Sequence, residues 1–135
     1  MTNRVLLVDD SWEVRDKLRK LLLQEPDIEL VGEAVSGAET LEVLQRLPVD
    51  VVVMDLNLPE IHGIATAKRI LADWSDVRVV IVSMQSDPNY VKVSFKAGVT
   101  GYLLKDCAFE ELVEAVHIVA AGGSYVSPEI EIGVP

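Results

Sequence analysis

The chain has 135 residues, half of them hydrophobic and a quarter charged, a composition typical of one compact globular domain. Its formal net charge is −10 and no cluster of Lys and Arg offsets it, which argues against direct nucleic-acid binding by these residues. No apolar stretch approaches the ~20 residues of a membrane span, and the N-terminus lacks a secretory signal pattern. The single cysteine, Cys107, cannot form an internal disulfide. We therefore expect a cytoplasmic protein that does not bind membranes.

Apolar runs of strand length recur along the chain, separated by segments of helical length. They span residues 5–8, 28–31, 51–54, 79–82 and 102–104. Runs this apolar suit strands that are buried on both faces of a parallel sheet. Their alternation with helical segments predicts a doubly wound α/β fold with a five-stranded parallel sheet and five flanking helices.

The first two helices are predicted from their capping residues and their apolar stripes. Asp10 or Ser11 can cap the first helix, which follows its strand directly. Ser36 and Glu39 form a capping-box pattern that begins the second helix, and Pro48 ends it. The apolar stripe of the first helix is predicted at Val14, Leu18, Leu21 and Leu22.

The third helix is predicted to begin near Gly63, and the fourth is harder to recognise. Residues 91–97 alternate between apolar and polar, a pattern that by itself indicates a strand. A parallel connection nevertheless needs a crossover, and Asp87 and Pro88 supply a cap and a first-turn proline. We predict a helix that is packed weakly and is therefore easily shifted.

The last helix is predicted to begin near Phe109 and to end at Gly122 and Gly123. Its inward face is predicted to comprise Phe109, Leu112, Val113, Val116 and Ala120. Residues 124–135 have neither the helical period nor the length of another domain. We therefore expect a domain at residues 1–123, followed by a linker stub or tail without an effector domain.

Polar side chains stand at the carboxyl ends of four of the apolar runs, where open α/β sheets bind ligands. They are Asp9 and Asp10, Asp55, Ser83 and Lys105. Two carboxylates about 4 Å apart repel each other by roughly 4 kcal/mol at an effective dielectric of about 20. We therefore expect positive charge among them, from a hard cation such as Mg²⁺ and from the ammonium of Lys105.

Such a set can carry out phosphoryl transfer. Asp55 lies alone at the end of the middle run and is the candidate nucleophile. Lys105 and the metal would offset charge on the phosphoryl oxygens, and Ser83 would donate a hydrogen bond. Each residue alone is more often a cap or a solvated loop residue, and it is their combination that indicates a site. No nucleotide-binding glycine motif is present, so the phosphoryl group must come from elsewhere.

Four motifs occur in an order and spacing that resemble the receiver domain of bacterial two-component response regulators, over about residues 3 to 121. They are Val8-Asp9-Asp10-Ser11, Met54-Asp55-Leu56-Asn57-Leu58-Pro59 with Gly63, Ser83-Met84, and Lys105-Asp106. The resemblance implies a flavodoxin-like sheet with strand order 2-1-3-4-5. It also implies a signalling switch rather than an enzyme, with only Mg²⁺-dependent self-phosphorylation from small donors and autodephosphorylation.

The resemblance also assigns roles. It implies that Asp55 accepts a phosphoryl group from a sensor histidine kinase, with Ser83 and Lys105 contacting the phosphate. Tyr102 matches the switch aromatic of the family, although by itself it would be read as a half-buried strand tyrosine. Asn57 and Gln85 match positions that tune autodephosphorylation, and as neutral amides they indicate an intermediate lifetime. The implied Mg²⁺ ligands are Asp10 and Asp55 directly, Asp9 mostly through water, and the backbone carbonyl of Asn57.

Residues 96–106 and 122–128 resemble the subfamily whose receivers precede a LuxR/NarL-type DNA-binding domain. This implies control of a transcription-regulator domain outside this chain and a possible phosphorylation-dependent homodimer. The residues 129–135 do not resemble the usual interdomain helix. The chain could be a truncated form or a natural single-domain protein. The cognate kinase, the stimulus, the regulated genes and the dimer face stay open.

Two alternative functions remain. The chain could be a degenerate receiver that acts as a phosphorylation-independent binding module. It could also be a phosphatase of the haloacid-dehalogenase type, because Asp55-Leu56-Asn57 loosely resembles the Asp-x-Asp nucleophile motif. In that family, however, the nucleophile follows the first strand and a cap domain is expected.

Overall fold

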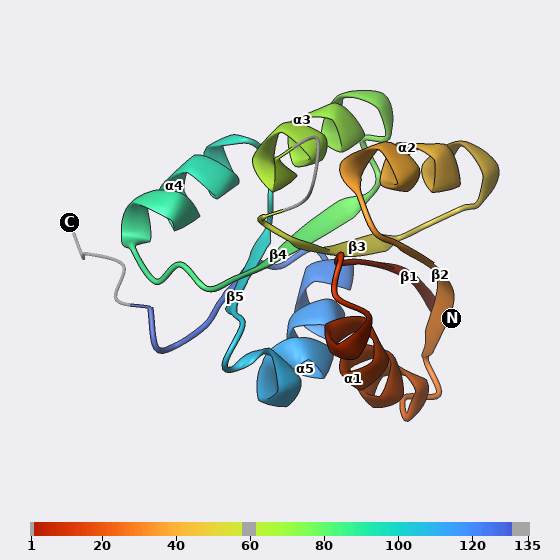
Figure 1. Ribbon diagram of the computed structural model, residues 1–135, viewed down its shortest axis with the longest axis horizontal. Coiled ribbons are helices and arrows are strands. Elements are labelled where there is room, and N and C mark those ends of the chain that lie inside the picture. The colour runs from red at the N-terminus through yellow and green to blue at the C-terminus, as the bar shows by residue number, and fades with distance from the viewer. Residues whose placement is uncertain (1, 58–61, 131–135) are drawn as a thin grey trace.

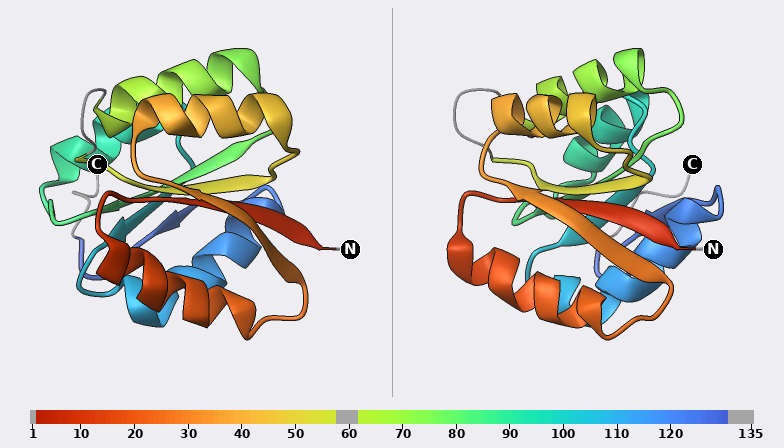
Figure 2. Two further views of the ribbon diagram at one scale, coloured as in Figure 1. Left: turned by 45° about the vertical axis from the view of Figure 1, so that its right-hand side comes forward. Right: turned by 90° about the vertical axis from the view of Figure 1, so that its right-hand side faces the viewer.

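The computed structural model describes residues 2–57 and 62–130. Its strands form one parallel sheet in the order β2-β1-β3-β4-β5-β6, covered by helices α2, α3 and α4 on one face and by α1 and α5 on the other (Figures 1 and 2). The strands are β1 (Asn3–Val8), β2 (Ile28–Ala34), β3 (Val51–Asp55), β4 (Arg78–Ser83), β5 (Gly101–Leu104) and β6 (Tyr125–Val126). The helices are α1 (Trp12–Leu23), α2 (Gly37–Arg46), α3 (Gly63–Asp73), α4 (Pro88–Lys96) and α5 (Ala108–Ala120). Within the described ranges, none of the helices is long and apolar enough to cross a bilayer.

The central strands are buried because helices cover both faces of the sheet. Leu6 and Val8 of β1 belong to the core beneath α2 and α3, whereas Val5 and Leu7 belong to the core beneath α1 and α5. Successive side chains of a strand point to opposite faces, so a continuous apolar run serves two cores at once. The doubly wound α/β prediction is confirmed.

The predicted helix caps are present. Ser11 Oγ accepts a hydrogen bond from the amide of Val14 at 3.3 Å, and Ser36 Oγ accepts one from the amide of Glu39 at 3.1 Å. Each bond satisfies an amide that has no partner within its own helix. These caps fix where α1 leaves β1 and where α2 leaves β2.

Helix α4 forms despite its strand-like pattern. Asp87 caps it by accepting a hydrogen bond from the amide of Asn89 at 2.9 Å, and Pro88 is its first residue. Only Val91 and Ser94 are buried in this helix, and Val93 is 50% exposed. The helix is therefore held by few core contacts, as the sequence predicts.

A sixth strand corrects the predicted five-stranded sheet. Tyr125 and Val126 form β6 beside β5, and the amide of Tyr125 donates to the carbonyl of Thr100 at 2.9 Å. Ile130 is buried in the same core cluster as Ile70 of α3 and Val91 of α4. Residues 124–130, expected as part of a linker stub, therefore pack on the domain. A two-residue strand is too short to produce a periodic pattern, and residues 131–135 lie outside the described ranges.

The inward face of α5 also differs from the predicted one. Phe109 is 37% exposed, and the ammonium of Lys17 lies 5.4 Å from the centre of its ring. The helix begins at Ala108, whose side chain is buried against the sheet. The next side chain, that of Phe109, therefore points toward the rim between α1 and α5. The buried residues of α5 are Ala108, Leu112, Ala115, Val116 and Val119.

Asp50 fastens the amino ends of β1 and β3, and its contribution to stability should depend on pH. Its carboxylate accepts from the Arg4 amide at 2.7 Å and from Arg4 Nε at 3.1 Å, and this pairing lowers the pKa of Asp50. A lowered pKa stabilises the fold above the unfolded value and loses this effect as pH falls through the folded value. We expect Asp50→Asn to lower the free energy of unfolding at pH 7 by roughly 1 kcal/mol, discounted for solvent screening.

Urea unfolding at pH 7 and at pH 3 measures this effect. The difference between Asp50→Asn and the unsubstituted chain should shrink at the lower pH. Below its usual pKa the carboxyl group is protonated in the unfolded chain, and folding must then release that proton to form the ion pair. A difference that is equal at the two pH values would contradict the ion-pair explanation.

Candidate functional site

The register of the sheet brings the predicted site residues to one edge. Val8 pairs with Met54, so Asp9, the residue after β1, and Asp55, the last residue of β3, lie side by side. Ser83 pairs with Leu104, and the amide of Lys105 donates to the carbonyl of Ser83 at 2.7 Å. The carboxyl ends of four strands therefore meet where open α/β folds bind their ligands.

The carboxylates form one cluster with a single ammonium. Oxygens of Asp9, Asp10 and Asp55 lie within 4.8 Å of one another, with Asp9 and Asp55 buried and Asp10 exposed. Lys105 Nζ lies 3.1 Å from Asp55 Oδ2 and 3.6 Å from Asp9 Oδ2. One ammonium cannot neutralise three ionised carboxylates, so the site favours a further cation.

The protonation equilibria reflect this crowding. Burial, together with the charges of Asp55 and Asp10, raises the pKa of Asp9 above its usual value, although the amide of Ser11 and Lys105 oppose the rise. Burial disfavours the charged form of Lys105, but the hydrogen bond to Asp55 and the charge of Asp9 outweigh it and raise the pKa of Lys105. The ammonium is therefore a fixed positive charge at physiological pH.

Backbone amides orient the two buried carboxylates. The amide of Ser11 donates to Asp9 Oδ1 at 2.8 Å, and the amide of Asn57 donates to Asp55 Oδ1 at 3.1 Å. Asp55 Oδ2 accepts a hydrogen bond from Lys105, so each oxygen of Asp55 is held in position by one hydrogen bond. Asn57 thus has a role through its amide that the sequence does not suggest. The motif residues Leu58 and Pro59 lie outside the described ranges.

Gly63 lies directly against the backbone of Asp55 and Leu56 at the end of β3. Its amide donates to the carbonyl of Leu56 at 2.9 Å. A Cβ at this position would lie 2.8 Å from the carbonyl oxygens of Asp55 and Leu56 and 2.9 Å from the Cα of Leu56. Only glycine permits this close approach, so Gly63 fixes where β3 ends and where α3 begins.

Ser83 and Tyr102 are linked through the backbone of Gln85. Ser83 is fully buried and its Oγ accepts from the amide of Gln85 at 3.0 Å, while the Tyr102 hydroxyl donates to the carbonyl of Gln85 at 2.9 Å. Burial raises the pKa of Tyr102, and the nearby Ser83 hydroxyl offsets part of this rise. Tyr102 is fully buried rather than half-buried, and it contacts the loop that leads into the weakly packed α4.

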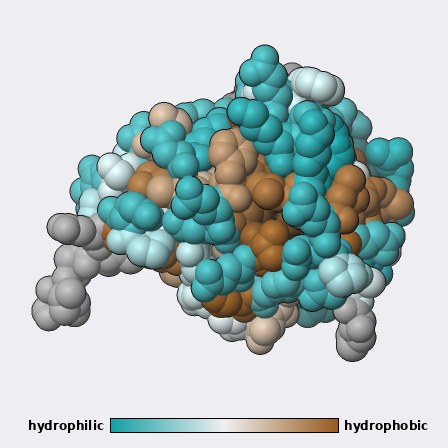
Figure 3. All heavy atoms as spheres, turned by 90° about the horizontal axis from the view of Figure 1, so that it is seen from below, coloured by the Kyte–Doolittle hydropathy of each residue, from teal (hydrophilic) through white to brown (hydrophobic). Residues whose placement is uncertain are grey.

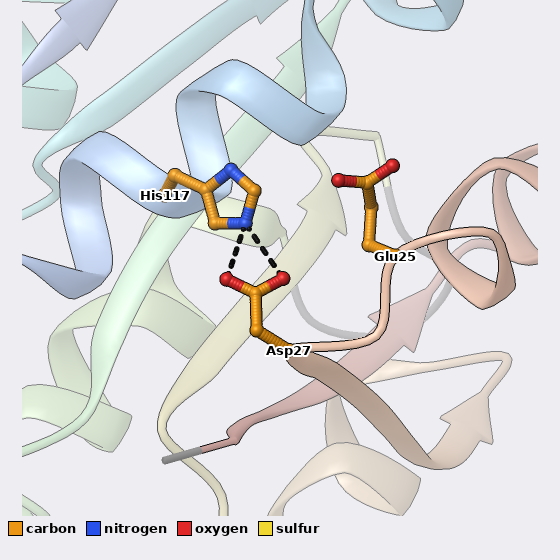
Figure 4. A group of neighbouring side chains, drawn as sticks. All are labelled: Glu25, Asp27 and His117. Atoms are coloured by element: carbon orange, nitrogen blue, oxygen red, sulfur yellow. Dashed lines mark hydrogen bonds and ion pairs between the residues drawn. The ribbon is translucent and has the colours of Figure 1, made fainter.

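A second group of ligand-type side chains lies between α5 and the turn before β2 (Figure 4). His117 Nε2 lies 3.0 Å from Asp27 Oδ1 and 2.9 Å from Asp27 Oδ2, and this bond lowers the pKa of Asp27. Glu25 lies within 4.8 Å of both. Because the nitrogen of His117 that faces this group is paired with Asp27, the group acts as a tie between two segments 90 residues apart.

His62 has a structural role that its neighbours in the sequence do not indicate. It is the N-cap of α3, and its Nδ1 accepts from the amide of Ile64 at 3.3 Å. A capping role, rather than metal binding, also agrees with the sequence, in which His62 has no second histidine or cysteine at metal-ligand spacing. Its position directly before Gly63 was the only feature that could have indicated a cap.

The geometry defines a class of protein: an α/β domain whose sheet carries, at its carboxyl edge, one lysine and an acidic cluster in which two of the three carboxylates are buried. Residues 5–117 match the family described as the response regulator receiver domain. Transcriptional regulatory protein DegU from Brevibacillus brevis is 32% identical over 127 residues, covering 94% of this chain and 54% of DegU. The nitrate/nitrite response regulator NarL of Escherichia coli K12 is 35% identical over 123 residues, covering 91% of this chain and 57% of NarL.

The solved structures agree with this match. A LuxR-family two-component response regulator from Aurantimonas superposes with a TM-score of 0.92 at 34% identity, covering 98% of this chain and 96% of that one. The receiver domain of RcsB from Escherichia coli has the same fold, with a TM-score of 0.88 at 23% identity. The chain belongs to the response regulator receiver domain family, and its relatives place it in the LuxR/NarL-type group. It spans little more than half the length of DegU and NarL.

Proposed function

We propose that Asp55 is the phosphoryl acceptor through which a sensor histidine kinase switches this receiver domain. The observation that carries this assignment is the placement of the Asp55 carboxylate. It is buried, both of its oxygens are oriented by hydrogen bonds, and it lies beside the ammonium of Lys105 and close to the carboxylates of Asp9 and Asp10. Preorganised charge of this kind is what phosphoryl transfer requires.

In the transfer step, a carboxylate oxygen of Asp55 forms a bond to phosphorus as the bond from phosphorus to the donor breaks. The electron pair of that bond leaves with the donor, which is a phosphohistidine or a small acyl phosphate. Lys105, 3.1 Å from Asp55, is positioned to neutralise charge on the phosphoryl oxygens. The amide of Asn57 limits the rotation of Asp55.

The donor set fits Mg²⁺, a hard cation that prefers oxygen ligands and accepts one or two carboxylates. When bound, Mg²⁺ would offset the negative charge of the carboxylates and of the incoming phosphoryl group. We assign Asp10 and Asp55 as its direct ligands, with Asp9 acting mostly through water and the carbonyl of Asn57 completing the protein ligands. The crowding of Asp9, Asp10 and Asp55 within 4.8 Å supports this assignment.

Phosphorylation would reach the surface through the loop after β4. A phosphoryl group on Asp55 would accept a hydrogen bond from the Ser83 hydroxyl, whose oxygen accepts one from the amide of Gln85, so a movement of Ser83 toward the phosphoryl group would also pull on Gln85. Moving Ser83 and Gln85 changes the partner of the Tyr102 hydroxyl, and α4 follows because few of its residues are buried. Two states separated by a few kcal/mol suffice for such a switch.

The remaining parts of the proposal concern the whole protein. We infer a cytoplasmic signalling switch, a domain of residues 1–123 on which residues 124–130 also pack, that controls a DNA-binding domain outside this chain without contacting nucleic acid itself. Apolar residues gather at the centre of the face that carries α1 and α5, ringed by hydrophilic ones (Figure 3), which is compatible with a phosphorylation-dependent homodimer. Beyond self-phosphorylation and autodephosphorylation, we propose no enzyme activity.

Incubation with Mg²⁺ and acetyl phosphate, followed by intact mass measurement, tests the assignment. We expect a gain of one phosphate on the unsubstituted chain and none on Asp55→Ala. Asp76→Asn is the matched control, because this carboxylate is exposed at the opposite edge of the sheet and its loss should not reduce the gain. No gain on the unsubstituted chain, or an undiminished gain on Asp55→Ala, would overturn the proposal.

The two alternatives give different results. A degenerate receiver would gain no phosphate, and the fluorescence of Trp12, which is 63% exposed and follows the acidic pair closely, would not respond to millimolar Mg²⁺. A haloacid-dehalogenase-type phosphatase would turn over a phosphate monoester, which we do not expect because Asp55 follows the third strand rather than the first.

A further inference from the structure

The segment Ser124–Ile130, called the strap below, is fastened to β5 immediately before Lys105. The amide of Ser127 donates to the carbonyl of Tyr102 at 3.0 Å. In return, the amide of Leu104 donates to Ser127 Oγ at 2.9 Å. Ser127 is 1% exposed, so these bonds form away from water and are costly to leave unmade. A strap side chain therefore holds the last residue of β5.

Glu111 in the first turn of α5 completes this fastening. Its Oε1 accepts from the Ser127 hydroxyl at 2.8 Å and from the Tyr125 hydroxyl at 3.0 Å. Burial and the bond to Glu111 raise the pKa of Tyr125 to about 12, so this hydroxyl remains a donor at physiological pH. Two strap residues thus depend on one carboxylate of the helix that follows Lys105.

The strap and the acidic site hold the same short piece of chain from opposite sides. The amide of Leu104 is bonded to Ser127, whereas the next amide, that of Lys105, is bonded to the carbonyl of Ser83 at 2.7 Å. Tyr102 is shared in the same way, since its carbonyl holds the strap and its hydroxyl holds the loop after β4. A displacement of the end of β5 must therefore disturb the bonds of the strap.

We propose that the strap, anchored by Ser127, is a latch that is closed in the unphosphorylated domain and loosened when Asp55 is phosphorylated. This inference rests on the proposed function. A phosphoryl group must fit where Lys105 Nζ now lies 3.1 Å from Asp55, and it draws Ser83, whose carbonyl holds the Lys105 amide. Both changes act on the end of β5. By thermodynamic linkage, phosphorylation and opening of the latch favour each other by the same factor. A variant whose latch is already open should therefore favour the phosphorylated state.

Beryllofluoride with Mg²⁺, which mimics the phosphoryl group, tests the latch at equilibrium. Hydrogen exchange of residues 125–130 should become faster when beryllofluoride is added to the unsubstituted chain. Ser127→Ala should bind beryllofluoride roughly threefold to tenfold more tightly, the range that one buried hydrogen bond supports. Tyr125→Phe, which removes only one hydroxyl, should change the affinity in the same direction by less.

The controls separate the possible failures. Ser124→Ala makes the same chemical change at an exposed strap residue and should leave the affinity unchanged. Asp55→Ala should abolish both binding and the change in exchange. If the unsubstituted chain binds no beryllofluoride and gains no phosphate, the proposed function fails. If it binds but strap exchange is unchanged, or if Ser127→Ala and Tyr125→Phe do not bind more tightly, the latch is overturned and the proposed function stands.

Discussion

Lys105→Met should destabilise the domain by about 2 kcal/mol in the absence of divalent cations, because it leaves two buried carboxylates without their ammonium. This loss of stability is smaller than the full cost of breaking a buried ion pair, because the Lys105 side chain is 23% exposed. The same substitution should slow phosphorylation by acetyl phosphate roughly 100-fold to 1000-fold, the usual loss when one preorganised charge is removed. Both effects arise from the contacts of Nζ with Asp55 and Asp9.

Urea unfolding with and without Mg²⁺ checks the stability effect. If the loss is electrostatic, Mg²⁺ should restore most of it, since a second cation can offset the same carboxylates. Lys92→Met on the exposed side of α4 is the matched control and should change neither stability nor phosphorylation rate substantially. Equal stabilities for the two variants, with or without Mg²⁺, would contradict the electrostatic role of Lys105.

Gly63→Ala should be the most damaging small substitution near the site. The added methyl would meet three backbone atoms of Asp55 and Leu56 at 2.8–2.9 Å, and backbone cannot move aside as a flexible side chain can. Overpacking of this kind costs about 1–3 kcal/mol. Because the displaced atoms carry Asp55, we also expect phosphorylation to slow by about 100-fold, as for a misplacement of about 1 Å.

Gly32→Ala provides the comparison for this prediction. A Cβ at Gly32 would meet only side chains, the nearest being the Cδ1 of Leu6 at 3.4 Å, which is ordinary contact. Thermal unfolding and the rate of phosphate gain, measured on both variants, should separate them clearly. If Gly63→Ala behaved like Gly32→Ala, Gly63 and Leu56 could move apart without disturbing Asp55, and the prediction would be wrong.

The elements that were predicted correctly are those whose cause is local in the chain. Ser11 and Ser36 cap helices because a side-chain oxygen reaches an amide three residues later. The apolar strands follow from burial on both faces of the sheet. Residues 91–96 lie in helix α4 against their own alternating pattern. The need for a crossover between parallel strands, together with the cap at Asp87 and the proline at Pro88, predicted this helix.

The features that were missed depend on distant residues. β6 is two residues long and exists because Thr100 and Tyr102 offer it carbonyls. Phe109 turned outward because α5 begins at Ala108, a phase fixed by packing against the sheet. Neither feature leaves a periodic pattern that could have been recognised beforehand.

By itself, the sequence determined the α/β class, the order of the elements and the candidate chemistry, because apolar runs, caps and the acidic and basic residues at strand ends follow from neighbours along the chain. Only the tertiary structure decided how these residues act together. It placed Lys105 against Asp55, linked Tyr102 to Gln85, and fastened Ser127 to Leu104 and Glu111. Each of these contacts joins residues that are far apart in the sequence, so no local pattern predicts it. The distances between the contacting atoms are set by strand register and helix packing rather than by local preference.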